Sequence, residues 1–164
     1  MADDHDMETR LWAALRADKI VMLGLVGAEG GHTRPMTAQF DRDAPPIWFF
    51  TSTDAVLVQK LGSGARATAA FVSSGHDLFA TIEGTLVRDD DPAVIDRLWN
   101  SQIAVWYEHG RADPTLVLLR FDTTEAEIWL NETSLVAGLK LMFGKNPKQD
   151  AKEKVARVSL SRPP

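Results

Sequence analysis

The sequence predicts a mainly antiparallel β protein, a barrel or a sandwich with a few helices at its periphery. About six segments are rich in β-branched and aromatic residues, a composition that favours strands. Most of them are separated by short turns. Helical segments do not alternate regularly with strands as they do in a parallel α/β sheet.

The chain begins with a predicted helix and a hairpin. Leu11, Trp12 and Leu15 share one face of the helix, which indicates that this face covers the core. Residues 19–26 and 32–40 lie on either side of a glycine-rich turn. We expect these two segments to pair as antiparallel strands.

An aromatic strand and a short helix are predicted next. Residues 47–51 read Ile-Trp-Phe-Phe-Thr, which is typical of a strand and gives three consecutive antiparallel strands. Ser52 or Thr53 is expected to cap a helix that ends at Gly62.

A second hairpin and a second helix follow. Residues 65–72 and 77–87 are the two strands of the hairpin. Asp91 followed by Pro92 is a strong helix start, because aspartate caps well and proline suits the first helical position. We expect this helix to run at least to Asn100.

The last strand signals are residues 115–121 and 125–130. No internal repeat or linker divides the chain, so its 164 residues fit one domain. The core is expected over about residues 7–130, and residues 131–164 are expected to form a C-terminal helix and tail.

Composition excludes several functional classes. A net charge of −5 gives no broad cationic surface for a nucleic-acid backbone. The absence of cysteine excludes disulfides and thiol chemistry. The acidic start lacks the features of a secretory signal, and the longest apolar run is nine residues, too short to span a membrane. We expect a cytoplasmic protein with no nucleic-acid or membrane partner.

Common catalytic and metal-binding patterns do not occur. The four histidines are far apart and lack the spacing of metal ligands or of a catalytic triad. No serine lies in a nucleophile-elbow motif. We therefore expect no metal site, and the sequence identifies no catalytic residue.

Two segments instead indicate ligand binding. Arg34, Pro35 and Met36 place an arginine and a proline inside a predicted strand. Because proline belongs at a sheet edge or bulge, this strand position is open to a ligand. Thr51 and Ser52 join a strand to a helix start, where hydroxyls and backbone amides can receive a phosphate.

Three further residues are candidates on helical segments. Lys60 lies one to two turns along the helix that follows Ser52. Trp99 and Trp106 are seven residues apart, which puts both rings on one side if the helix continues through them. They are either buried core residues or a cover for a planar ligand, because polar residues surround them.

These motifs together resemble the flavin-binding split barrels related to pyridoxamine-phosphate oxidase, specifically the general stress protein 26 group. The resemblance extends from about residue 11 to residue 160. The matching elements are Arg34-Pro35-Met36, Ile47 to Ser52, Gly75-His76-Asp77-Leu78, Gly84, Leu98-Trp99-Asn100, Trp106, Asp113-Pro114 and Ala126-Glu127-Ile128-Trp129.

The resemblance implies a six-stranded antiparallel Greek-key split barrel that forms a homodimer with flavin sites at the subunit interface. It implies FMN as the cofactor, with FAD as the alternative. The candidate flavin-binding residues that follow from it are Arg34, Pro35, Met36, Thr37, Phe50, Thr51, Ser52, Lys60, Trp99 and Trp106.

The chain departs from the oxidases of the wider family at one position. Those enzymes carry a lysine six residues after the position of Thr51, where this chain has Leu57. The phosphate contact is therefore either weakened or moved to Lys60. The segment around Trp106 also lacks an arginine cluster for a substrate phosphate, which argues against oxidation of vitamin B6.

Two functions follow from these observations. The first is a flavin-dependent oxidoreductase, a reductase or an oxidase acting on a small molecule, in which the flavin performs hydride chemistry. The alternative is a non-catalytic dimer that sequesters or senses flavin, which the lack of an acid/base group favours. A third, weaker reading is a pocket that no longer uses flavin.

Overall fold

The sheet of this protein is antiparallel throughout. The structure is a computed structural model that describes residues 3–131 and 155–161. Its strands follow the order β2-β1-β4-β5-β6-β3, and β7 pairs with β6. They are β1 (Ile20–Leu25), β2 (Arg34–Thr37), β3 (Ile47–Ser52), β4 (Ala65–Val72), β5 (Leu78–Arg88), β6 (Leu116–Leu130) and β7 (Val155–Ser159).

The two ends of this sheet approach each other without pairing as a ladder. A single antiparallel bridge joins Gln39, two residues beyond β2, to Trp48 of β3. The incompletely closed antiparallel sheet confirms the mainly β fold predicted from the strand signals and agrees with the split barrel that the resemblance implies.

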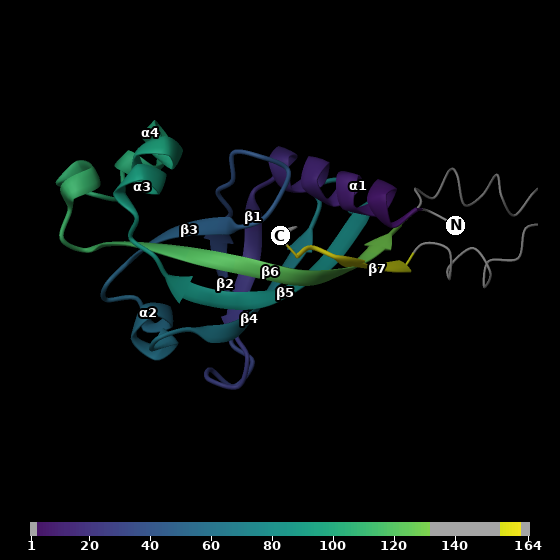
Figure 1. The fold of residues 1–164 in the computed structure, drawn as a ribbon, viewed down its shortest axis with the longest axis horizontal. Coiled ribbons are helices and arrows are strands. Elements are labelled where there is room, and N and C mark those ends of the chain that lie inside the picture. Colours follow the sequence, from purple (N-terminus) through teal and green to yellow (C-terminus); the bar gives the residue numbers. More distant parts are fainter. Residues whose placement is uncertain (1–2, 132–154, 162–164) are drawn as a thin grey trace, which may run out of the picture.

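The helices lie at the periphery of the sheet (Figure 1). They are α1 (Asp4–Ala17), α2 (Val56–Leu61), α3 (Pro92–Leu98), α4 (Ser101–Ala104) and the 3-10 turn η1 (Gly110–Ala112). Figure 1 shows α3 and α4 together at one end of the sheet, and α1 toward the other end beside β7. None of the helices within the described ranges is long and apolar enough to cross a membrane.

Two apolar clusters hold these elements together. The main core lies between the inward faces of the strands and α1, whose Leu11, Trp12 and Leu15 are almost fully buried, as predicted. A second cluster packs α3, α4 and the following loop against Trp48 of β3 and Leu118 of β6. This second cluster positions the candidate site.

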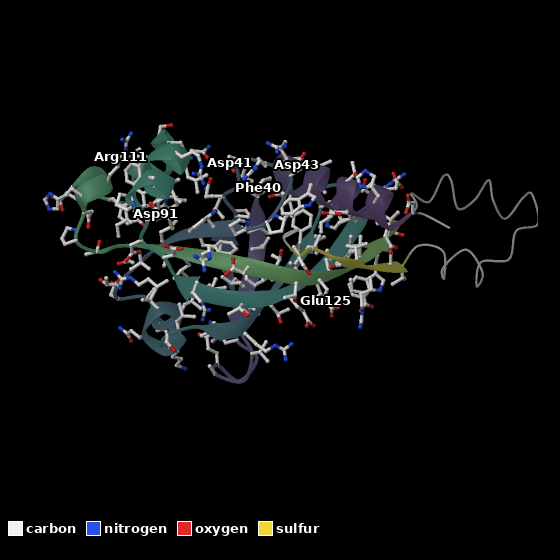
Figure 2. The ribbon with its side chains drawn as sticks, in the orientation of Figure 1. Phe40, Asp41, Asp43, Asp91, Arg111 and Glu125 are labelled. Atoms are coloured by element: carbon white, nitrogen blue, oxygen red, sulfur yellow. The ribbon has the colours of Figure 1, made fainter. Side chains whose placement is uncertain are left out.

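Charged contacts connect the turn after Phe40 to helices on two sides. Asp41 forms an ion pair with Arg97 of α3 at 2.7 Å, and Asp43 pairs with Arg16 of α1. Figure 2 shows Phe40, Asp41 and Asp43 along this turn. These pairs are exposed, so each contributes little by itself.

Several predicted boundaries differ in the structure. The second predicted helix ends at Leu98 rather than reaching Asn100. Residues 116–130 form one long strand with a register shift at Gly84 of β5. A Cβ on Gly84 would lie 2.4 Å from the Asp122 carbonyl oxygen, so the close approach of β6 requires glycine.

The C-terminal region contains a strand that the sequence reading assigned to the tail. β7 adds a seventh strand to the six that were predicted, and its Val158 is buried in the main core. The predicted C-terminal helix lies outside the described residues.

Candidate functional site

A cavity of about 450 Å³ lies where the chain after β2, strand β3 and the α4 region meet. Strands form one wall and the helical segment forms the other. The lining residues are Pro35, Met36, Thr37, Gln39, Phe50, Thr51, Ser52, Gln102, Ile103, Trp106 and Tyr107. Seven of them are among the candidate residues named from the sequence: Pro35, Met36, Thr37, Phe50, Thr51, Ser52 and Trp106.

The β2 wall follows from the alternation of side chains along a strand. Pro35 and Thr37 are exposed, whereas Met36 is half-buried and packs against the main core. β2 is at an end of the strand order, and among the described strands it pairs with β1 alone. On the side of β2 away from β1 there is no described strand to pair with, so the missing N–H of Pro35 costs no ladder hydrogen bond there.

The β3 wall provides an aromatic ring and two hydroxyl groups. β3 pairs with β6 along its whole length, from Ile47 opposite Phe121 to Ser52 opposite Leu116. Phe50 and Ser52 therefore point to one side of the sheet, and Thr51 points to the other. All three residues line the cavity, at the end of β3.

The helical wall is built by α4 and the residues after it. The Asn100 side chain caps α4 by accepting hydrogen bonds from the amides of Gln102 and Ile103 at 2.9 and 3.1 Å. Gln102 and Ile103 reach the cavity from this short helix, and Trp106 and Tyr107 reach it from the loop that follows. Trp106 is 81% exposed and lies at the mouth of the site.

One hydrogen bond ties the helical wall to the strand wall. The Tyr107 hydroxyl donates to the Thr51 backbone carbonyl at 2.6 Å. Burial of the phenol, with a smaller effect of the Asp113 carboxylate, raises the pKa of Tyr107 to about 12. Tyr107 is therefore a neutral donor over the physiological pH range.

Trp99 and Trp106 do not lie on one continuous helix, so the condition under which both rings would share a side is not met. Asn100 is extended, with φ −148° and ψ 173°, and it separates α3 from α4. The ring of Trp99 packs against Phe50 and Tyr107 at centroid distances of 6.0 and 5.8 Å. Trp99 supports the aromatic wall from behind and does not line the cavity.

Arg34 is turned away from the cavity lining. Its guanidinium pairs with Glu29, whose side chain is only 2% exposed, and it also donates to the Leu23 carbonyl at 3.4 Å. The Leu25 amide donates to the same carboxylate. The Arg34 hydrogen bond is the largest effect that holds the pKa of Glu29 below its usual value.

Lys60 and Leu57 have different environments on α2. Leu57 is 1% exposed and belongs to the main core, which leaves no room there for a solvated lysine. Lys60 is exposed in the last turn and is not among the lining residues. Its charge makes the smallest contribution to the lowered pKa of Glu29.

Sequence reasoning missed four lining residues: Gln39, Gln102, Ile103 and Tyr107. Glutamines, isoleucine and a tyrosine carry no motif of their own. The only available signal was that Gln39 follows the Arg34 segment closely, and that the other three surround Trp106.

The described lining combines apolar residues with uncharged polar residues. Among the residues that the structure describes, no charged side chain lines the cavity, and no cluster of His, Asp and Glu could hold a metal ion. Aromatic, hydroxyl and amide groups suit a planar, neutral heterocycle.

Comparisons with known proteins identify relatives over most of the chain. Residues 6–151 match the family model described as "Pyridoxamine 5'-phosphate oxidase like". A general stress family protein of Xanthomonas campestris pv. campestris is 56% identical, with a TM-score of 0.78, over 82% of this chain and 93% of that one. No curated protein sequence matches.

Two more solved structures are similar. The general stress FMN/FAD binding protein of Xanthomonas citri is 56% identical, with a TM-score of 0.75, over 79% of this chain and 92% of that one. A general stress protein 26 of Jannaschia sp. CCS1 is 27% identical, with a TM-score of 0.74, over 96% and 99% of the two chains.

Proposed function

This chain belongs to the pyridoxamine 5'-phosphate oxidase-like family, and we propose that its cavity binds a flavin in a cytoplasmic homodimer. FMN is the proposed cofactor and FAD the alternative. The observation that carries the proposal is the uncharged cavity between β3 and α4, which joins aromatic side chains to hydroxyl and amide groups. The FMN/FAD-binding relative at 56% identity supports it.

The residues present fit a flavin. The volume of about 450 Å³ lies within the range of small-molecule sites, roughly 300–1,000 Å³. Met36, Phe50 and Trp106 offer apolar surface for the tricyclic ring, and Thr51 and Ser52 offer hydroxyls to the ribityl phosphate. When bound, the flavin supplies hydride-transfer chemistry, and this chain supplies binding and orientation.

We propose that Lys60 provides the positive charge for the phosphate. Arg34 is engaged by the buried Glu29, so its charge is largely neutralised in place. Lys60 lies on the helix that follows Ser52 and is exposed to solvent. A lysine side chain is long and flexible enough to reach toward the start of its own helix.

The homodimer is supported by an apolar stripe on the outer face of the sheet. The strand register puts its members on one face: Ile20, Met22, Val72, Phe79, Trp129 and Val155. Exposure of the four aliphatic side chains is between 39% and 49%. Contiguous apolar surface of this kind marks interaction sites. The stripe extends to the cavity, because Met22 of β1 pairs with Pro35 of β2.

The flavin proposal is tested by titrating the unliganded protein with FMN, FAD and riboflavin. We expect heat of binding and quenching of tryptophan emission, because Trp106 lies at the cavity mouth. A titration that gives neither signal with any of the three would overturn the proposal.

Two functions of the flavin-loaded protein remain to be separated by experiment. The oxidoreductase hypothesis expects NADH or NADPH to bleach the bound flavin under anaerobic conditions. The alternative, a sequestering or sensing protein, expects no bleaching. The uncharged lining favours it, because the lining residues that the structure describes include no carboxylate or histidine to act as acid or base.

A further inference from the structure

Gln39 is a buried polar residue whose side chain lacks a partner within the described ranges 3–131 and 155–161. It is 8% exposed. Its backbone amide and carbonyl are both used by Trp48, each at 2.8 Å. The side-chain amide of Gln39 makes no hydrogen bond within the described residues. The other two buried polar residues there differ: the Ser73 hydroxyl donates to the Asp77 carboxylate, and the Thr123 hydroxyl donates to the Leu160 carbonyl.

Strand-like alternation directs this amide to the cavity side. Ala38 and Phe40 on either side of Gln39 are buried in the main core, so the side chain of Gln39 points the opposite way. That side carries Thr37 and Trp48, its bridge partner in the second cluster. Gln39 is one of the residues that line the cavity.

A buried amide without a partner is unfavourable and rare in native proteins, and a ligand in this cavity would supply the partner that the described residues do not. The glutamine amide presents a donor N–H and an acceptor C=O side by side. The complementary ligand feature is an acceptor beside a donor on one planar edge. An imide, in which an N–H lies between two carbonyls, has this arrangement and carries no charge.

We propose that Gln39 is a specificity-determining residue that hydrogen-bonds the imide edge of the ligand's heterocycle. With the flavin of the proposed function, on which this inference rests, that edge is the pyrimidine N3–H and an adjacent carbonyl. The Gln39 carbonyl accepts from N3–H, and its amide donates to the carbonyl oxygen. No charged group in the described lining competes for this edge.

The test compares FMN with FMN methylated at N3, which lacks the N–H donor, by calorimetric titration. We expect the parent protein to prefer FMN by about tenfold, the effect of a neutral hydrogen bond or two. Gln39→Met keeps the length of the side chain and removes the amide, so this variant should bind both ligands equally. Gln59→Met is the matched control, because the Gln59 amide lies on α2 and, within the described part of the chain, donates to the Asp54 carbonyl alone, at 3.3 Å.

A second measurement is independent of the ligand. Because methionine does not need a hydrogen-bond partner, Gln39→Met should melt at the same temperature as the unliganded parent or higher. A lower melting temperature of unliganded Gln39→Met would show that the protein itself satisfies the amide, and would overturn the proposal.

The binding outcomes separate the two proposals. Equal binding of FMN and N3-methyl FMN by the parent, or discrimination retained by Gln39→Met, overturns the role of Gln39 and leaves flavin binding intact. A parent protein that binds neither ligand overturns the flavin function, and the role of Gln39 with it.

Discussion

The hydroxyl of Tyr107 donates a 2.6 Å hydrogen bond to the backbone carbonyl of Thr51, 56 residues earlier in the chain. Tyr107 is in the helical wall of the cavity and Thr51 is in the strand wall. The bond therefore links the two walls.

Removal of this hydroxyl should loosen the site. We expect Tyr107→Phe to lower the free energy of unfolding by about 1 kcal/mol, because the carbonyl loses its donor while the ring packing remains. Flavin should dissociate several-fold faster, measured by stopped-flow fluorescence. Unchanged dissociation together with lower stability would mean that Tyr107 is important for folding only.

Stability should fall at high pH because of the same residue. The pKa of Tyr107 is raised from 10.0 to about 12 in the folded protein, so the unfolded chain loses its proton first. Its contribution is fully present below pH 10 and is lost as pH rises toward 12. Tyr107 is the only tyrosine in the sequence, so tyrosinate absorbance reports it directly. A titration midpoint near 10 in the folded protein would contradict this expectation.

Lys60→Ala should separate phosphate binding from ring binding. If Lys60 meets the phosphate, its loss should weaken FMN binding by roughly 1.5–3 kcal/mol, or about one to two orders of magnitude, and leave riboflavin unaffected. Binding is measured at fixed ionic strength, because exposed charges are screened. Gln59→Ala on the same helix controls for effects on α2. Equal, small changes for both ligands would identify Lys60 as a surface residue only.

Glu29→Gln should destabilise the β1–β2 hairpin. The change leaves Arg34 charged beside a neutral group, and breaking a buried ion pair in this way costs about 3 kcal/mol. Urea unfolding measures the loss. Asp6→Asn removes one partner of an exposed pair with Arg10 and should cost less than about 1 kcal/mol. Similar losses for the two variants would show that burial of Glu29 contributes nothing.

The Glu29 effect should also depend on pH. Its pKa is lowered below the ordinary 4.5 in the folded protein, so the contribution is present above that pH and is lost as pH falls through the folded value. The difference in stability between the parent and Glu29→Gln should therefore shrink in acid.

Val72→Glu should disrupt the proposed dimer. Val72 is 45% exposed on the outer stripe, so a monomer tolerates a carboxylate there, but an apolar interface does not. Light scattering should report a dimer for the parent protein and a monomer for the variant. A folded parent monomer at low micromolar concentration would remove the dimer.

The sequence by itself determined the features that depend on near neighbours. Alternating apolar residues gave the hairpins, and Asp91 before Pro92 gave the start of α3 with its cap to the Ala93 amide. The edge-strand proline and the hydroxyls of Thr51 and Ser52 gave most of the strand wall. These signals are local because side-chain periodicity and capping involve residues a few positions apart.

Only the tertiary structure decided which distant residues share the cavity. Tyr107 reaches Thr51, and Gln39 is buried beside Trp48, through chain crossings that no short motif encodes. The extended Asn100 separated the two tryptophans that spacing alone had placed together. Arg34 was likewise predicted to face the ligand, and the buried carboxylate of Glu29 engages it instead. The partners of the Arg34 guanidinium and of the Gln39 amide are set by which groups the folded chain brings close to them. This depends on packing between segments that are distant in the sequence.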